Sequence, residues 1–337
     1  MNLHQWRSHI NKFNDSFEKS SPTLKEWQEN TIVNMPRFNK QNSIWTTKAM
    51  FAGVKERAVV LVGSSPRLAG DVERLRGLND NFRIICANSA LKFLLKHGVR
   101  PHYTICLDSD RIDIPQHLDC DNEGITLLAS SVVCHEALDL WKGPILFMPY
   151  YSVSKDLKPQ LRRRLGRKID SGGNSITQAL VLSTLIWGCQ TVIFVANEYC
   201  FDESYYADKE AAKQEKLETL YPVIDVLGHK RWTLPALYVY AIWTEKVCND
   251  LSPPAFFMDT SFGLLGKDAK GIHVMEIAEA IKRTNWAFEV KQRLNNASSD
   301  DEKAQIVKEI SPPDDQSEVL RYDMQVQRPR LLQLARS

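Results

Sequence analysis

Residues 58–66 read AVVLVGSSP, and this stretch decides the fold. The first five residues are apolar and mostly β-branched, as is typical of a strand buried on both faces of a parallel sheet. Gly63 ends the run, and the spacing of Leu68, Val72 and Leu75 predicts a helix directly after it. A buried strand, a glycine turn and a helix form the opening of a βαβ unit.

The same alternation continues along the chain. Strands are predicted at 83–87, 103–107, 126–130, 145–148, 191–196 and 255–258, and helices at 24–35, 89–97, 175–187, 205–220, 235–248 and 272–281. Strands that alternate with helices pair in parallel, with the helices on the two faces of the sheet. The sequence therefore predicts an α/β fold with a Rossmann-like, doubly wound, mostly parallel sheet and with helical N- and C-terminal extensions.

Changes in polarity divide the chain into three parts. Residues 1–50 are polar with isolated aromatic residues, and we expect a helical lead-in there. Residues 51–285 carry the strand–helix pattern, which predicts a Rossmann-like nucleotide-binding catalytic domain. Residues 286–337 contain acidic clusters and a double proline, which predict a polar, partly flexible C-terminal extension.

Charge and cysteine usage exclude several classes of protein. The 43 Lys and Arg residues nearly balance the 41 Asp and Glu residues, so the net charge demands neither nucleic acid nor a membrane as partner. The segment 160–168, QLRRRLGRK, fits a solvated helix face or a patch that binds phosphate or an acceptor. The seven cysteines form no CxxC pair, which favours reduced thiols over disulfides or a zinc site. Without a signal peptide or a run of ~18 apolar residues, a cytoplasmic chain with no membrane span is expected.

Ligands of a doubly wound sheet bind beyond the carboxyl ends of its strands, where the strand order reverses. The first polar cluster at such a place is the turn Gly63, Ser64, Ser65 and Pro66. Glycine lets the backbone approach a ligand, and N–H groups at the following helix start can hold a phosphate together with the serine hydroxyls. The turn is neither a GxGxxG fingerprint nor a P-loop, so a plain tight turn explains it equally well.

Two further clusters follow the next two predicted strands. Asn88 and Ser89 come after the second strand, where the asparagine can contact a ribose or a base edge or can cap the helix. Asp108 and Asp110 come after the third strand. Two carboxylates so close in a loop can bind a divalent metal, a ribose diol or an acceptor hydroxyl, although a solvated turn is the plainer alternative.

A second glycine turn leads into the long apolar helix. Its candidate nucleotide-binding residues are Gly172, Gly173, Asn174, Ser175 and Thr177. Paired glycines before a helix start present N–H groups to an anion, and Asn174 and Ser175 can also cap the helix. Asn197 and Glu198 follow the strand at 191–196 and add polar groups at the same edge. The chain has no HExxH motif and no GxSxG elbow, which argues against a zinc hydrolase and a serine hydrolase.

These clusters occur in an order that resembles a known family. The matching segments are 60–68, 88–102, 106–108, 172–179, 188–198 and 258–263. Their order and spacing resemble the MptE-like family, which is named for archaeal 6-hydroxymethylpterin diphosphokinase and includes the motility-associated-factor glycosyltransferases. The glycine turn also looks like part of the nucleotide site of bacterial sialyltransferases, which use CMP-sugars. This chain departs from the family pattern by an extra residue before Leu68 and by Ser261-Phe262 in place of Glu-Gly.

The resemblance implies a nucleotide-dependent transferase, with a glycosyltransferase that uses a nucleotide-activated, CMP-linked sugar as the favoured form. The turns at 63–66 and 172–175 would hold the donor phosphates, and Asn88 and Asn197 the nucleoside. Asp108 or Asp110 would position or deprotonate the acceptor hydroxyl. The acceptor is expected to be a glycan, a protein or, less favoured, a nucleic acid, and the sequence does not require Mg²⁺.

Two alternatives stay open. A diphosphokinase or related phosphotransferase would use ATP on a small heterocyclic substrate, with Asp108 and Asp110 holding Mg²⁺ between the phosphates. A non-catalytic nucleotide-binding module would have kept the fold without the chemistry, and the altered motif at 258–263 motivates that alternative.

Overall fold

The computed structural model describes a defined part of the chain. The described residues are 22–45, 56–150, 155–169, 172–202, 207, 220–252, 255–267 and 269–309. The chain forms two compact units, Met1–Val274 and Met275–Ser337, and each unit is described by itself.

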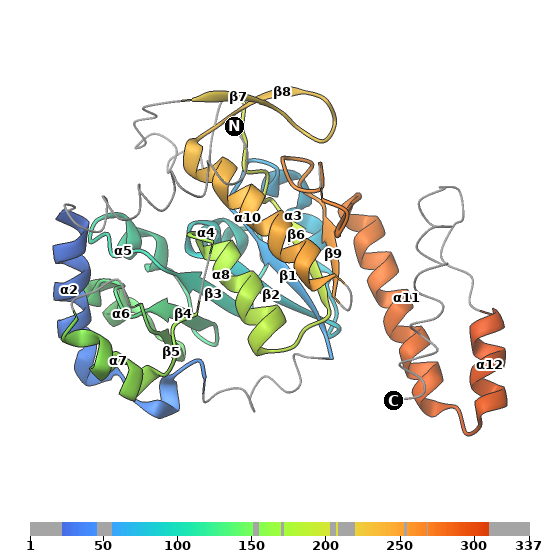
Figure 1. The fold of residues 1–337 in the computed structure, drawn as a ribbon, viewed down its shortest axis with the longest axis horizontal. Helices are drawn as coiled ribbons and strands as arrows, with labels where there is room; N and C mark the ends of the chain where they lie inside the picture. The colour runs from blue at the N-terminus through green and yellow to red at the C-terminus, as the bar shows by residue number, and fades with distance from the viewer. Residues whose placement is uncertain are drawn as a thin grey trace. The chain divides into compact units, whose positions relative to one another are not determined.

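The first unit contains an eight-stranded sheet in the order β10-β9-β6-β1-β2-β3-β4-β5 (Figure 1). Its strands are β1 Ala58–Val62, β2 Phe82–Ala87, β3 Tyr103–Cys106, β4 Thr126–Ser130, β5 Ile145–Met148, β6 Thr191–Val195, β9 Phe256–Asp259 and β10 Ile272–Val274. All seven neighbouring pairs are parallel. The predicted α/β fold with a Rossmann-like, doubly wound sheet is confirmed, and all of the predicted strands are present.

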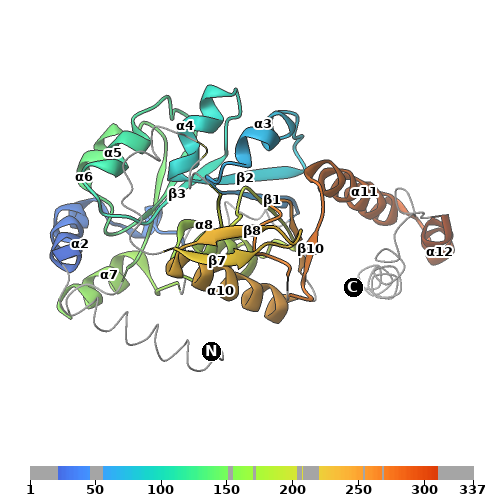
Figure 2. The same cartoon turned by 90° about the horizontal axis from the view of Figure 1, so that it is seen from above.

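Helices cover both faces of this sheet. They are α2 Pro22–Asn34, α3 Leu68–Arg76, α4 Asn88–Lys96, α5 Asp113–Leu118, α6 His135–Leu140, α7 Leu157–Leu165, α8 Ser175–Val181 and α10 Pro235–Leu251. Figure 2 shows α3, α4, α5 and α6 on one face and α7, α8 and α10 on the other. The chain adds strands in one direction from β1 to β5 and then returns to add β6 on the other side of β1. Because crossovers between parallel strands are right-handed, this reversal puts the connecting helices on opposite faces of the sheet.

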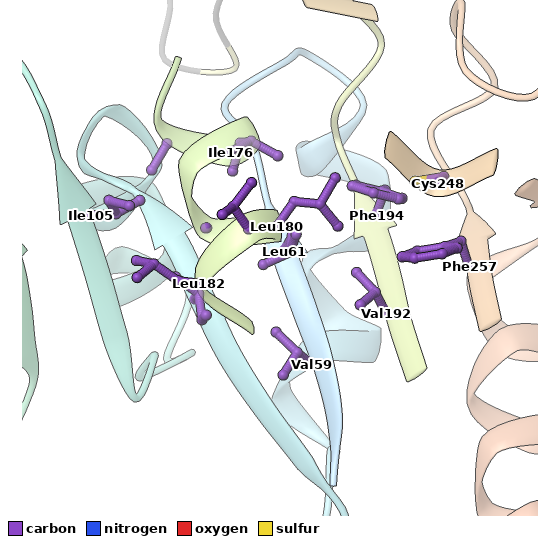
Figure 3. Packing of buried hydrophobic residues seen from close by; sticks show 14 of the residues in the cluster. Val59, Leu61, Ile105, Ile176, Leu180, Leu182, Val192, Phe194, Cys248 and Phe257 are labelled. Carbon is purple, nitrogen blue, oxygen red and sulfur yellow. The ribbon is translucent and has the colours of Figure 1, made fainter. Parts of the chain in front are cut away.

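The core lies between the sheet and α8 (Figure 3). Val59 and Leu61 of β1 share a buried cluster with Ile176 and Leu180 of α8 and with Phe194 of β6. Each fully buried side chain of this size contributes about 1.5–3 kcal/mol relative to an exposed one. The helix continues as a π-helical turn over Leu182–Ile186, so the predicted helix at 175–187 is confirmed with a local change of winding.

Several side chains outside the core bear on the sequence predictions. Arg164 of the basic segment donates to the carbonyls of Met35 and Phe38, whereas Arg162 and Arg163 are exposed. All seven cysteines are free, and only Cys120 is half-exposed. None of the helices in the described ranges combines the length and the apolar character needed to cross a bilayer.

A separate two-stranded antiparallel hairpin precedes α10. It consists of β7 Tyr221–Ile224 and β8 Lys230–Thr233, and the sequence analysis did not predict it. The helix predicted at 205–220 lies outside the described residues except for Ala207 and Leu220.

Within residues 275–309, the described part of the second unit, lie two helices, α11 Ile277–Asn296 and α12 Asp300–Glu309. Val290, Leu294 and Ile306 form a small apolar cluster between them. The helix predicted at 272–281 is wrong at its start, because Ile272–Val274 pairs with β9 as the edge strand β10. Residues 310–337 of the predicted extension lie outside the described residues.

Candidate functional site

The strand order reverses between β1 and β6, which are neighbours in the sheet. The chain leaves β1 toward β2 on one side, whereas β9 and β10 lie on the other side of β6. Such a reversal leaves a crevice at the carboxyl edge of the sheet, which is where doubly wound proteins bind ligands. The predicted turns at 63–66 and 197–198 therefore lie side by side at this edge.

Gly63 is held against the end of β6. Its N–H donates to the carbonyl of Val195 at 2.9 Å. A Cβ atom at position 63 would lie 2.3 Å from the carbonyl oxygen of Ala196 and 2.6 Å from Oδ1 of Asn197. A glycine is thus required here for the close approach of two backbone segments.

The serines of this turn differ in their contacts. Ser64 Oγ accepts a hydrogen bond from Ser89 Oγ at 2.9 Å, which joins the turn after β1 to the start of α4. Ser65 N–H donates to the carbonyl of Ala196 at 3.3 Å. Ser65 Oγ is buried and has no hydrogen-bond partner among the described residues. A buried hydroxyl without a partner is costly, so this oxygen is a candidate ligand contact.

Glu198 occupies part of the space that the sequence analysis assigned to a phosphate. Its buried carboxylate accepts from the backbone N–H of Arg67 at 3.3 Å, just before the start of α3. The other carboxylate oxygen accepts from Arg231 at 2.8 Å. A carboxylate at a helix start takes the N–H groups that an anionic ligand would otherwise use. The structure therefore gives Glu198 a scaffold role at this turn.

Asn197 is likewise committed to the scaffold. Its side-chain N–H groups donate to the carbonyls of Leu61 at 2.8 Å and Val195 at 2.9 Å, so the amide ties β1 to β6. Its backbone N–H donates to Ser261 Oγ at 2.8 Å. Asn197 is buried, and a contact with a nucleoside stays a prediction.

Asn88 is half-buried and is the first residue of α4. The N-cap position belongs to Ala87, so the alternative that Asn88 caps this helix is wrong. The predicted contact with a nucleoside is still open to Asn88, which lies next to the Ser89–Ser64 pair.

Backbone strain concentrates at the same edge of the sheet. Ala196, Tyr199 and Phe262 each have a φ of 55°, and no other non-glycine residue in the described ranges has a positive φ. Each such conformation costs on the order of 1–3 kcal/mol and persists only where the surroundings enforce it. Strain of this kind is typical of ligand sites, and here it marks the ends of β6 and β9.

Asp259 ends β9 and is fully buried there. Burial raises the pKa of its carboxyl from 3.8 to about 7, although hydrogen bonds from Ser261 and Phe262 and the charge of Arg67 oppose the rise. One carboxylate oxygen accepts from the N–H of Phe262 at 3.2 Å, and the other has no partner in the described structure. Asp259 is not among the site residues predicted from the sequence, although it lies in the motif at 258–263.

The loop after β3 carries the two predicted acidic residues. Asp110 accepts from the backbone N–H groups of Ile112 at 2.7 Å and Asp113 at 2.6 Å, so its carboxylate helps to start α5. Asp108 is exposed, yet the protein around it and the nearby charge of Asp110 raise the pKa of its carboxyl. A carboxylate that is both accessible and partly desolvated is the better candidate base of the two.

Helix α2 supplies neighbours of this loop that the sequence analysis missed. Asn30 donates to the carbonyl of Ser109 at 3.2 Å. Burial and the charge of Asp110 raise the pKa of Glu26, which shows that the Glu26 carboxyl lies near the acidic loop. The helical lead-in therefore forms one wall of the acidic loop.

The second glycine turn packs against α10. A Cβ atom at Gly172 would lie 2.4 Å from the ring of Trp243, and one at Gly173 would lie 2.5 Å from the ring of Tyr240. Gly173 also has a φ of 105°, a conformation that favours glycine. The turn thus packs against aromatic side chains of α10, a contact that the predicted helix at 235–248 did not reveal.

Asn174 and Thr177 form a capping box at the start of α8. Asn174 Oδ1 accepts from the N–H of Thr177 at 2.8 Å, and Thr177 Oγ1 accepts from the N–H of Asn174 at 3.1 Å. Their side chains are thus engaged in starting the helix. Ser175 is the first residue of α8.

Tyr240 links the second glycine turn to the acidic loop. Burial and then the charge of Asp108 raise the pKa of its phenol. The ring of Tyr240 therefore packs against Gly173, and its phenol lies within range of the charge of Asp108. The structure brings together three predicted clusters, namely the turn at 63–66, Ser89 and residues 197–198, and the charge of Asp108 reaches Tyr240 beside the turn at 172–174.

Comparison with known proteins identifies a family and a solved structure with a similar fold. The MAf glycosyltransferase from Magnetospirillum magneticum AMB-1 is 12% identical with a TM-score of 0.52, and the similarity covers 80% of this chain and 49% of that one. The likeness is one of fold, and the chain spans about half of that protein. No curated protein matches the chain. The model of the family described as 6-hydroxymethylpterin diphosphokinase MptE-like matches residues 29–204, slightly more than half of the 337 residues. The chain therefore belongs to the MptE-like family.

Proposed function

We propose that the protein is a glycosyltransferase that uses a nucleotide-activated sugar, with a CMP-linked sugar as the favoured donor. The family description names a diphosphokinase and the similar fold is that of a glycosyltransferase, and both of these are transferases. The observation that carries the proposal is the position of Asp108 after β3, where its exposed carboxylate has a raised pKa and its charge reaches Tyr240, which packs against the second glycine turn.

The donor would lie along the carboxyl edge of the sheet. Ser65 Oγ, which is buried without a partner, and the Ser64–Ser89 pair would contact the donor phosphates. Asn88 is the better contact for the nucleoside, because the amide of Asn197 is engaged by β1 and β6. Neutral hydroxyl donors suit a donor whose leaving group carries a single phosphate. Most of the rate enhancement would come from holding the donor and the acceptor in the correct orientation.

The acceptor hydroxyl would bind next to Asp108. As the acceptor oxygen forms its bond to the anomeric carbon, the bond between that carbon and the phosphate oxygen breaks. The leaving nucleotide keeps the electron pair, and Asp108 takes the proton of the hydroxyl. A raised pKa makes this carboxylate a stronger base than an ordinary aspartate.

Substitution of Asp108 tests this assignment. We expect Asp108→Asn to lower the rate of sugar transfer by about 10²–10⁴-fold, which is the usual contribution of a general base. Affinity for the donor nucleotide should stay within a factor of about two, because Asp108 faces the acceptor. Transfer can be followed as release of the free nucleotide from CMP-, UDP- and GDP-sugars, and nucleotide affinity by calorimetry.

Asp110→Asn is the matched control, since it lies in the same loop and its amide oxygen can still accept from Ile112 and Asp113. It should retain at least a tenth of the wild-type rate. If the two variants lose activity equally, or if neither does, Asp108 is not the base.

The family description favours a second candidate, a diphosphokinase. Asp108 and Asp110 would then hold Mg²⁺ together with the phosphates of ATP. Among the described residues, no group of three or more His, Cys, Asp or Glu side chains is arranged to bind a metal, so this pair is the candidate. Mg²⁺-dependent release of AMP from ATP, without release of nucleotide from any nucleotide sugar, would select this candidate.

A further inference from the structure

The hairpin β7–β8 carries an unusual share of the exposed apolar surface. Six of the eleven large hydrophobic residues that are exposed in the described ranges lie between Leu220 and Tyr238. At the hairpin itself, Leu227 is 56% exposed, Ile224 45% and Trp232 38%. Clustering of this kind marks an interaction surface, whereas scattered exposed apolar residues need no explanation.

The register of the hairpin separates an anchored face from a free face. Pro222 lies opposite Trp232 and Ile224 lies opposite Lys230, so these four residues share one face. Arg231, on the other face, bonds to Glu198 at 2.8 Å and Asp202 at 2.9 Å. The hairpin is therefore fixed to the segment after β6 by one face and presents the other outward.

The tip of the hairpin is rigid. The buried carboxylate of Asp225 accepts from the N–H groups of Leu227 at 2.9 Å and His229 at 2.8 Å. Gly228 has a φ of 86° and closes the turn with an N–H to the carbonyl of Asp225 at 3.1 Å. Leu227 is thus displayed at the tip by a preorganised turn, which reduces the ordering cost of binding.

Cations surround this apolar tip. The ammonium group of Lys230 lies 5.6 Å from the ring centroid of Trp232. Lys267 donates to the carbonyl of Ile224 at 3.1 Å and is itself exposed. The acidic groups nearby, Asp225 and Asp202, are both paired with Arg231. Within the described ranges, neither Lys230 nor Lys267 forms a salt bridge, so the surface combines aliphatic groups, an indole and two cations.

We propose that the β7–β8 hairpin docks onto an anionic phospholipid surface, with Leu227 and Ile224 entering the acyl boundary and Lys230 and Lys267 among the headgroups. Trp side chains favour this interfacial zone, and cations near it gain from the negative surface potential. Because the hairpin is bonded to Glu198, docking would hold the carboxyl edge of the sheet near the membrane surface.

Two other occupants fit the surface less well. A sugar-binding surface needs flat rings together with hydrogen-bonding groups, and protruding Leu227 and Ile224 contribute neither. A second copy of the chain would have to neutralise Lys230 and Lys267, and the same face of another copy presents like charges. An anionic lipid surface accepts both the aliphatic groups and the cations.

Vesicle sedimentation of the full chain tests the proposal. Phosphatidylcholine vesicles that contain phosphatidylglycerol should bind the wild-type chain, and vesicles of phosphatidylcholine alone should bind it much less. Leu227→Asp should weaken binding by tenfold or more, since about 1.5–3 kcal/mol is lost when a leucine no longer transfers from water. Lys230→Gln should weaken it about fivefold, which corresponds to about 1 kcal/mol per cation.

The matched control is Leu185→Asp, because Leu185 is 60% exposed on the π-helical turn, far along the chain from the hairpin. It should bind vesicles like the wild type, and all variants should keep their melting temperature. Leu227→Ser replaces Leu227→Asp if the latter fails to fold.

Three results would overturn the proposal. The first is a wild-type chain that the anionic vesicles do not retain. The second is binding that is lost in an Arg162→Glu, Arg163→Glu double variant and kept in Leu227→Asp, which would assign the binding to α7. The third is a wild-type chain that does not bind vesicles but forms a dimer in gel filtration that Leu227→Asp breaks, which would assign the hairpin to a second copy.

Discussion

Gly263→Ala is expected to lose about 3 kcal/mol or more of unfolding free energy. A Cβ atom at this position would lie 2.0 Å from the carbonyl oxygen of Glu198 and 2.3 Å from its Cα. Both atoms belong to the backbone, so no side-chain rotation relieves the clash. Glu198 is already held there, because its carbonyl accepts from the N–H of Leu264 at 2.9 Å. Urea denaturation followed by circular dichroism measures the loss.

Gly70→Ala is the matched control for this prediction. Gly70 lies inside α3, and a Cβ atom there would meet nothing within 4 Å. An alanine in a helix is favoured over glycine by roughly 0.5–1 kcal/mol, so this variant should be slightly more stable than the wild type. A Gly263→Ala variant as stable as Gly70→Ala would contradict the close packing of the β6 and β9 ends.

Asp259→Asn is expected to remove a large pH dependence of stability. In the folded chain, burial raises the pKa of Asp259 to about 7, whereas the unfolded chain should titrate near 3.8. The folded state thus binds the proton more tightly, so the contribution of Asp259 to stability is complete below about pH 4 and is lost as the pH rises to 7. This difference corresponds to on the order of 4 kcal/mol.

The measurement is the unfolding free energy of both chains between pH 4 and 8. The unfolding free energy of Asp259→Asn minus that of the wild type should increase by on the order of 4 kcal/mol between pH 4 and pH 8. The constant cost of burying an amide cancels in that comparison. Asp250→Asn makes the same exchange at an exposed aspartate and is the matched control. A difference for Asp259→Asn that does not change with pH would mean that Asp259 is not desolvated as the fold implies.

The sheet could be predicted from the sequence because its signals are local. The run at 58–62 is buried at every position, and the β-branched apolar stretches after it form the other central strands. A strand buried on both faces can be recognised from its own residues, because they form a continuous apolar run. The edge strand Ile272–Val274 lacks this signal because it is short and contains His273. Its sequence therefore predicts the start of a helix instead of a strand.

The candidate site could be located from the sequence, but the roles of its residues could not. Gly63, Asn197 and Glu198 meet across more than 130 residues of chain, and their hydrogen bonds depend on the neighbouring positions of β1 and β6. Likewise, Gly173 meets Tyr240 only because α8 and α10 cover the same face of the sheet. Contacts of this kind follow from strand order, which local periodicity does not specify.

Binding of a nucleotide at the turn after β1 is tested most directly by a thermal-shift panel. CMP, UDP, GDP and adenine nucleotides would be compared, each with and without Mg²⁺, on the wild type and on Ser65→Ala. Ser65→Ala removes the buried, unpartnered hydroxyl and leaves the N–H bond to Ala196 in place. We predict stabilisation by CMP of about 2.7 kcal/mol at a hundredfold excess over Kd, reduced in Ser65→Ala. No shift with any nucleotide, or equal shifts in both chains, would contradict the account.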